Sequence, residues 1–479
     1  MSKFQSIANF CKKPAFILGL ILASFFLKEM FLSALLPIFS GVDEYRHYNT
    51  IQYLNEPKEK NWEIKDVPHE KFSRSDFEGN RFSEEILQTG KAMDIETIWS
   101  TKASFTNSYV GANENEINSR KWDPYNKIYP PDIVVNAGLY HRLAAYIEKF
   151  FTNSSILIRF YAIRTLSIIF GTLAILAAYF LLKNIGFSQK NSLIVSAIIS
   201  LQPRFSIYIT NINYDALLIF IFTLFALGGI LFLKQGLNWK NGLLILASFI
   251  LGMLAKGTSI VLIIPLFALI AFFIFQKIKE RKINLKYTAT ALLMLMIVSG
   301  IFFLKYNLGT LALPKNSDPS LAAFLTRSLH RIPATSTDYW GGVSWTRDNF
   351  SNEFVGVIWV AEALSIVGIF LYLFSRKKLE FLPEKKYICF FLLLMLALQI
   401  GIRFNNWKIT AGGSELLYGT PGRYFIPNLT VHMALIFVGI GALVRQKKYL
   451  NTLLLTGLVF MFAFSLHIIF NVVIPRFYL

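Results

Sequence analysis

The sequence is poor in cysteine, and it lacks the common nucleotide-binding motifs. Only Cys11 and Cys389 occur among its 479 residues, and neither falls in a segment that we expect outside the cytoplasm. Disulfide bonds and a metal site built from cysteines are therefore excluded. No glycine-rich phosphate loop follows a strand, and there is neither a His-Glu-x-x-His helix nor a nucleophile elbow. The sequence thus contains no recognisable site for nucleotide hydrolysis, and an activated substrate must supply the energy of any reaction.

Long apolar runs dominate what is present. Hydrophobic residues make up 54% of the chain and charged residues only 16%, whereas about 25% of residues are charged in soluble proteins. We therefore predict an all-α, polytopic membrane protein with about eleven spanning helices, each long enough to cross ~30 Å of hydrocarbon. The predicted spans are residues 15–38, 156–183, 192–209, 214–233, 241–256, 258–276, 287–305, 353–375, 386–402, 424–444 and 449–474.

The net charge of +19 fits this topology and does not indicate a nucleic-acid partner. The positive-inside rule places the loops rich in Lys and Arg in the cytoplasm, together with the N-terminus. The C-terminus then lies outside. We expect one membrane-embedded domain over residues 1–479, with amphipathic helices in its large first external loop. Its parts are the first helix (15–38), an external loop (40–154), helices two to seven (156–305), a second external loop (306–352) and the C-terminal helices (353–474).

Two adjacent carboxylates, Asp43 and Glu44, follow the first apolar run. Ionisable groups beside hydrocarbon must be solvated, paired or used. We interpret this pair as facing an external, water-filled cavity, where either carboxylate could deprotonate an acceptor hydroxyl. The alternative is that both are merely solvated beyond a helix end. His47 lies one helical turn from Asp43 and could share its face, or it could be a hydrogen-bonded structural residue.

Three further charged residues fall on the predicted external side. Asp215 opens a predicted span, where a carboxylate also stabilises the helix dipole. Lys256 lies between two closely spaced spans and could balance a phosphate or simply extend to the interface. Arg423, followed by Tyr424, stands at the start of a predicted helix, where arginine can bind a phosphate or anchor to lipid headgroups.

Aromatic residues and paired glycines mark the second external loop. Trp340 and Trp345 could stack on the C–H faces of a sugar, but tryptophan and tyrosine also anchor membrane interfaces. The carboxylates of the external side could act as base or as ligand, so the sequence leaves a divalent cation open and any metal unknown.

Six short motifs follow one another along nearly the whole chain. An Asp-Glu-x-x-His follows the first helix, and a Pro-Pro precedes the second. An Asn-x-Asp lies where a later helix begins on the external side. A lysine then separates two spans, and a Trp-Gly loop is followed by Gly-Arg-Tyr-Phe-x-Pro. In this order the motifs resemble the bacterial membrane glycosyltransferases of the GT-C superfamily, in particular a branch of predicted membrane proteins linked to cell-surface polysaccharide synthesis.

The resemblance implies a GT-C fold and an enzyme that takes a sugar from a polyprenyl-phosphate donor. Transfer would occur on the external face of the bacterial cytoplasmic membrane, to a glycan, lipid or protein acceptor. Asp43 would be the catalytic base, with Glu44 second. The predicted substrate-binding residues are His47, Asp215, Lys256, Trp340, Trp345, Arg423 and Tyr424. The alternatives are a transporter or flippase of polyprenyl-linked glycans and a non-catalytic scaffold for polysaccharide assembly.

Overall fold

Long helices account for most of the protein. The computed structural model describes residues 13–55, 84–93, 137–280, 319–343, 352–376, 379–411 and 420–478, together with Thr290, Leu293, Met294 and Ile297. Every regular element within these residues is a helix, and none is a strand. The all-α prediction is therefore confirmed for the described part of the chain.

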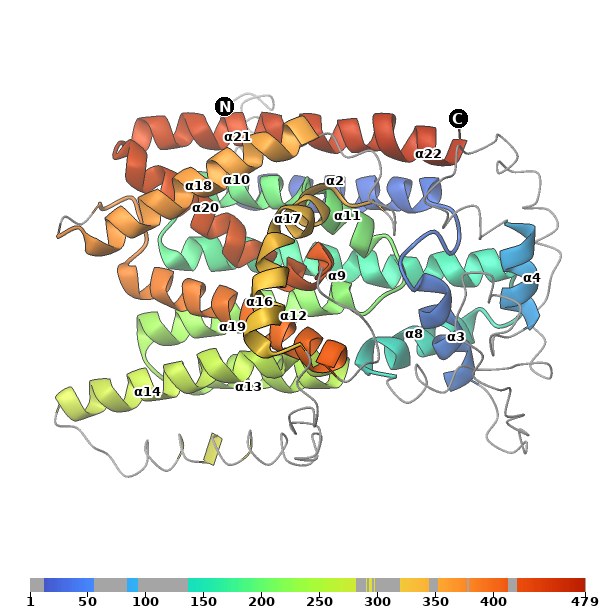
Figure 1. The fold of residues 1–479 in the computed structure, drawn as a ribbon, viewed down its shortest axis with the longest axis horizontal. Coiled ribbons are helices and arrows are strands. Elements are labelled where there is room, and N and C mark those ends of the chain that lie inside the picture. The colour runs from blue at the N-terminus through green and yellow to red at the C-terminus, as the bar shows by residue number, and fades with distance from the viewer. Residues whose placement is uncertain are drawn as a thin grey trace, which may run out of the picture.

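Eight helices among the described residues are long and apolar enough to cross a membrane. They run side by side along the long axis of the molecule (Figure 1), and they coincide with eight of the predicted spans. They are α2 (Pro14–Leu35), α9 (Ile156–Ile185), α12 (Asp215–Gln235), η2–α14 (Gly257–Leu262 and Ile263–Lys279), α18 (Asn352–Phe374), α19 (Lys385–Ala411), η4–α20 (Gly422–Asn428 and Leu429–Val444) and α21–η5–α22 (Lys447–Ile468, Ile469–Val473 and Ile474–Tyr478).

The other three predicted spans have different outcomes. Residues 192–209 form a bent pair, α10 (Gln189–Ser200) and α11 (Pro203–Ile209), with an angle of 65° between the two helices. The break has a local cause, because proline disfavours a helical residue before it and Gln202 is extended. Residues 241–256 form the shorter helix α13 (Trp239–Ala255). Residues 287–305 lie almost wholly outside the described residues, so the total of eleven stays a prediction.

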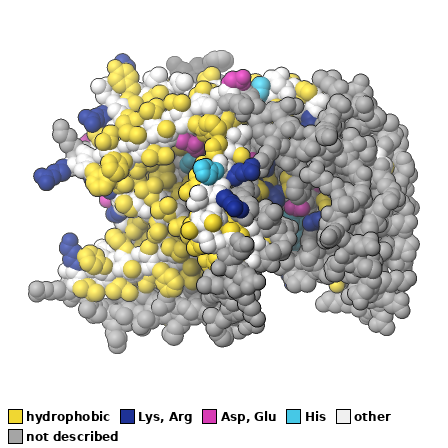
Figure 2. Space-filling model, in the orientation of Figure 1, with side chains coloured by type: hydrophobic (Ala, Val, Ile, Leu, Met, Phe, Trp, Pro, Cys, Tyr) yellow, Lys and Arg dark blue, Asp and Glu magenta, His cyan; other side chains and the backbone are white. Residues whose placement is uncertain are grey.

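The outer surface of the long helices is apolar. Hydrophobic side chains cover this part of the molecule in Figure 2, and residues such as Phe31, Phe370 and Val459 are each more than half exposed. Soluble proteins rarely expose contiguous apolar patches larger than a few hundred Å². This surface and the spanning helices identify a multi-pass membrane protein.

Shorter helices gather at one end and across one face of the bundle (Figure 1). At the end lie α3 (Glu44–Leu54), α4 (Glu84–Ala92) and α8 (Leu139–Phe150), while α16 (Leu321–His330) and α17 (Ile332–Gly341) cross the face. Helix α8 supplies part of the amphipathic helix predicted near the end of the first loop. Most of that loop lies outside the described residues, and its external position stays a prediction.

Helices α18 and α20 cross at two glycines. A β-carbon on Gly368 would lie 1.9 Å from the carbonyl oxygen of Gly439, and one on Gly439 would lie 2.2 Å from that of Ser365. The Ser365 hydroxyl also donates to the carbonyl of Leu435 at 3.0 Å. Small residues of this kind allow two membrane helices to approach closely.

We expect Gly368→Ala to destabilise the protein by about 1–3 kcal/mol, because the added methyl group must force the helices apart. Gly356→Ala on the same helix is the matched control, since a β-carbon there meets nothing within 4 Å. Thermal unfolding in detergent, followed by size-exclusion chromatography, measures the difference. Equal melting temperatures for the two variants would contradict this packing argument.

Candidate functional site

Charged and aromatic side chains converge at the end of the bundle where α3 begins. Asp43 is the residue before α3, with a left-handed φ of 57° and no side-chain hydrogen bond that caps the helix. Its carboxylate oxygens lie 3.5 Å from Nη2 of Arg423 and 3.9 Å from Nη1 of Arg46. The Asp43 side chain is 27% exposed. It is therefore a carboxylate that is partnered by cations and still open to a substrate.

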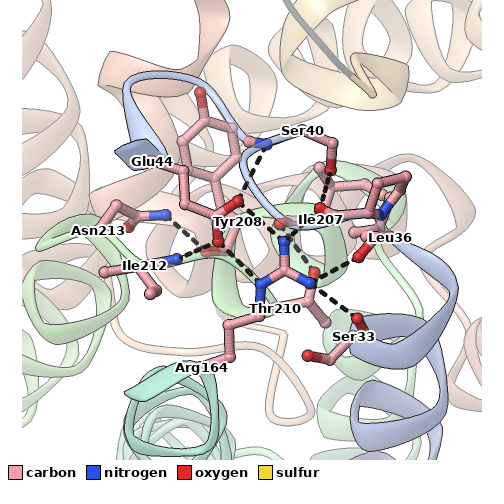
Figure 3. Close-up of polar contacts among 12 residues, drawn as sticks. Ser33, Leu36, Ser40, Glu44, Arg164, Ile207, Tyr208, Thr210, Ile212 and Asn213 are labelled. Carbon is pink, nitrogen blue, oxygen red and sulfur yellow. Dashed lines mark hydrogen bonds and ion pairs between the residues drawn. The ribbon is translucent and has the colours of Figure 1, made fainter. Parts of the chain in front are cut away.

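Glu44 is oriented into the protein instead. Its side chain is fully buried and forms a two-pronged ion pair with Arg164, in which Nε and Nη2 each lie 2.8 Å from a carboxylate oxygen (Figure 3). The backbone N–H groups of Ile212 and Gly41 donate to the same carboxylate at 2.9 and 3.2 Å. Four donors thus satisfy Glu44, and this arrangement fixes where α3 starts.

Arg164 uses all five of its N–H groups in this contact. Besides the two that face Glu44, the guanidinium donates to the carbonyl oxygens of Ser33, Leu36 and Pro37 at 2.6–2.8 Å. Positive charge is favourable where a helix presents unpaired carbonyls at its C-terminus. Arg164 therefore binds the end of α2 and the start of α3 together. Sequence reasoning missed it, although an arginine inside a predicted span was the available signal.

Lys256 and Asp215, which the predicted topology places on the same external side, are in contact. Lys256 occupies the extended break between α13 and η2. Its Nζ lies 3.5 Å from Oδ1 of Asp215, the first residue of α12. The ammonium group also lies 4.1 Å from the ring centre of Tyr214 and 5.1 Å from that of Tyr424. Aromatic faces and a carboxylate therefore hold this cation in place.

Arg423 is connected to a second arginine that sequence reasoning also missed. The hydroxyl of Tyr208 accepts hydrogen bonds from both arginines. Nη1 of Arg423 lies 3.5 Å from it, and Nη2 of Arg204 lies 3.4 Å from it. Arg204 in turn pairs with Asp338 of α17 at 2.8 Å, and Asp338 accepts a hydrogen bond from the backbone N–H of Gly422. The turn that carries Arg423 is thereby fixed to α17.

Among the residues that the structure describes, the cluster carries more positive than negative charge. Its cations are Arg46, Arg204, Lys256 and Arg423, and its carboxylates outside the buried Glu44–Arg164 pair are Asp43, Asp215 and Asp338. Guanidinium and ammonium groups close to one another suit an anion such as a phosphate, which arginine can bind through two parallel hydrogen bonds. The arrangement can therefore hold a phosphate beside an accessible carboxylate.

His47 lies at the same site and is neutral. Nδ1 of His47 lies 2.9 Å from Nε2 of His141, a residue of α8 that sequence reasoning did not single out. Burial, and after it the charges of Lys256, Arg423 and Arg46, lower the pKa of His47 to about 3. Burial also lowers the pKa of His141, with His47 as the next cause.

Trp340, the one predicted tryptophan that the structure describes, does not join this cluster. Trp340 is fully buried, and its indole N–H donates to Glu362 at 3.1 Å. Glu362 also pairs with His432 at 3.2 Å. A neighbouring cavity of about 420 Å³ is lined by Glu362, His432 and Phe425, among other residues. Trp345 lies outside the described residues, and its role stays a prediction.

No metal cluster is present in the part of the chain that the structure describes. Among these residues, no group of three or more His, Cys, Asp or Glu side chains could hold a metal ion. Cys389 is a free thiol, whereas Cys11 falls outside the described residues.

We expect Arg164→Met to destabilise the protein by about 3–5 kcal/mol, because it leaves the Glu44 carboxylate buried without a counter-charge. Arg142→Met, at an exposed position of α8, is the matched control. Adding Glu44→Gln to Arg164→Met should recover part of the loss, since it removes the uncompensated charge. The yield of monodisperse protein and its melting temperature report the effect. An Arg164→Met protein as stable as Arg142→Met would refute this role.

The buried histidine pair predicts a loss of stability in acid. The unfolded chain takes up protons near pH 6.5, whereas folded His47 resists protonation until about pH 3. Stability is therefore complete above pH 6.5 and falls between these values, and His47 alone accounts for a loss of ~2 kcal/mol from pH 6.5 to 5. Melting temperatures of wild type and His141→Gln at pH 7 and 5 test this. A variant with the full wild-type pH dependence would contradict it.

A comparison with known protein families found a match over part of the chain. A model of the family described as dolichyl-phosphate-mannose-protein mannosyltransferase matches residues 143–302. This segment is about a third of the chain; it contains Arg164, Arg204, Asp215 and Lys256 but neither Asp43 nor Arg423. No curated protein matches the chain significantly. The family match indicates a glycosyltransferase of the GT-C type that uses a polyprenyl-phosphate sugar.

Proposed function

We propose that this protein transfers a sugar from a polyprenyl-phosphate donor to a glycan, lipid or protein acceptor of the bacterial cell envelope. The reaction takes place at the outer face of the cytoplasmic membrane, where the predicted topology puts the α3 end of the bundle. The observation that carries the proposal is the accessible Asp43 carboxylate, held 3.5 Å from Arg423 within a cluster of cations. The family match over the helices that carry Lys256 and Arg204 supports the same chemistry.

The donor phosphate binds to Arg423 and Lys256. The Tyr208 hydroxyl, which also accepts a hydrogen bond from Arg204, holds the Arg423 guanidinium in place. Asp215 and Tyr214 hold the Lys256 ammonium. Both cations are thus oriented before the substrate arrives, which is the arrangement that stabilises developing negative charge most effectively. The apolar helices around the site leave the polyprenyl chain in the bilayer.

Asp43 acts as the general base. It accepts the proton of the acceptor hydroxyl while that oxygen forms a bond to the anomeric carbon of the sugar. The bond between this carbon and the phosphate oxygen breaks, and its electron pair stays on the departing polyprenyl phosphate. Arg423 and Lys256 neutralise the resulting charge. Attack from the face opposite the leaving phosphate inverts the configuration at the anomeric carbon.

Glu44 serves this reaction indirectly. Because Arg164 and two backbone N–H groups engage its carboxylate, it keeps the first residue of α3 in place. Asp43 is the preceding residue, so its direction depends on that anchor. We assign the base to Asp43 and a positioning role to Glu44.

The test is transfer from labelled donors by purified protein in liposomes. A panel of radiolabelled polyprenyl-phosphate sugars is combined with membrane glycolipid extract, and the label that leaves the carrier is counted. We expect Asp43→Asn to lower transfer by about 10²–10⁴-fold, the usual contribution of a general base. Glu384→Gln is the matched control, because it makes the same change at an exposed loop position.

The outcomes separate the candidate functions. Folded Asp43→Asn protein that transfers sugar at the wild-type rate would refute the base assignment. Label that crosses the bilayer on an intact carrier, for every donor in the panel, would refute the enzyme and favour a flippase.

A further inference from the structure

Two buried histidines connect α3 and α8 beside the proposed phosphate site. His47 and His141 make a ring-to-ring hydrogen bond of 2.9 Å between Nδ1 and Nε2. The His47 side chain is 7% exposed and that of His141 1%. Two neutral imidazoles can bond in this way only if one nitrogen donates and the other accepts. The position of each proton therefore follows from the remaining partners of the pair.

The backbone of Gly138 decides the direction of this bond. Its N–H donates to Nδ1 of His141 at 3.2 Å, so that Nδ1 accepts and carries no proton. The proton of neutral His141 then resides on Nε2, which donates to Nδ1 of His47. Neutral His47 must in turn carry its proton on Nε2. The assignment rests on the hydrogen-bond network, as tautomer assignments ordinarily do.

The protonated Nε2 of His47 lies on the side of the ring away from His141. No residue in the described part of the chain makes a hydrogen bond with it. The His47 ring packs edge-on against Tyr214, 4.9 Å between centres, and the ammonium of Lys256 lies on that same tyrosine. After burial, the charges of Lys256, Arg423 and Arg46 contribute most to the lowered pKa of His47. The N–H is thus a donor available at the cation cluster.

We propose that His141 is a positioning residue that locks His47 as an Nε2–H donor toward the phosphate or a sugar oxygen of the bound donor. This inference rests on the proposed function for the identity of the ligand, but the tautomer follows from the geometry alone. His47 then cannot be the catalytic base near neutral pH, because its Nδ1 lone pair is occupied and its Nε2 is already protonated. The base remains Asp43.

Packing also connects the His47–His141 pair to the segment that carries Lys256. A β-carbon on Gly138 would lie 2.4 Å from the carbonyl oxygen of Ala255, so the start of α8 rests directly on the turn before Lys256. Gly138, whose N–H sets the direction of the histidine bond, therefore packs against the residue that precedes Lys256.

The first part of the test is nitrogen NMR of protein labelled with ¹⁵N-histidine. The chain has only six histidines, and His47→Gln assigns the His47 signals. Wild type should show His47 protonated at Nε2 alone. His141→Leu should show exchange between tautomers, and His141→Gln should restore the wild-type signal, because its amide can donate to Nδ1. A His47 tautomer unchanged in His141→Leu would overturn the proposal.

The second part is a double-mutant cycle on the donor KM in the liposome assay. His141→Leu should raise the donor KM roughly three- to tenfold, as expected for one neutral hydrogen bond, with little change in kcat. In the His47→Gln background the same change should have no effect, because the glutamine amide donates without help from His141. An equal effect in both backgrounds would show a merely structural role and overturn the proposal.

The two parts also separate this inference from the proposed function. The NMR measurement needs no sugar donor, so it determines the His47 tautomer whether or not the protein is active. A wild-type protein that transfers no sugar from any carrier would refute the proposed function alone. If the wild-type protein transfers sugar but its His47 shows a mixture of tautomers, the proposed role of His141 is refuted and the proposed function is retained.

Discussion

The contact between Arg164 and Glu44 positions everything at this end of the bundle. Removing two charges from water is costly, and the cost is offset only when the remaining hydrogen bonds are also made. Here the five donors of the arginine and four acceptor positions of the glutamate are all engaged. The contact joins the end of α2, the start of α3 and the segment before α12 (Figure 3). These three segments can shift only together.

Two neighbouring carboxylates thereby acquire different environments. Glu44 is buried and fully paired, while Asp43, one residue earlier, remains accessible and faces Arg423. Asp43 has a left-handed backbone, and its side chain makes no hydrogen bond that caps the helix that begins after it. Aspartate tolerates this conformation better than most residues. A residue held in such a conformation by its surroundings is a common feature of functional sites.

Much of this site could be predicted from the sequence, and the reason is topological. Asp43, Asp215, Lys256 and Arg423 all interrupt or flank apolar runs on one side of the predicted bundle. The order of the runs was enough to place them at the same end, and the structure brings them into contact. No knowledge of helix packing was needed for this step.

The rest of the site depends on helix rotation, which the sequence does not specify. Arg164 and Arg204 lie within or beside predicted spans, and nothing local indicates which neighbour they face. His141 was visible only as one polar residue of an amphipathic helix. Trp340 belongs to the opposite case: its loop suggested a sugar, but the rotation of α17 buries the ring against Glu362.

Helix α17 shows how this rotation couples the site to its surroundings. One side of the helix presents Asp338 to Arg204 and to the backbone of Gly422. Tyr339 contributes to the lining of the 420 Å³ cavity and bonds to His432 at 3.0 Å. Gly422 has no room for a side chain, since a β-carbon would lie 2.3 Å from the Tyr339 nitrogen. A shift of α17 at the cavity must therefore move the turn that carries Arg423, so cavity and phosphate site share one rigid connection.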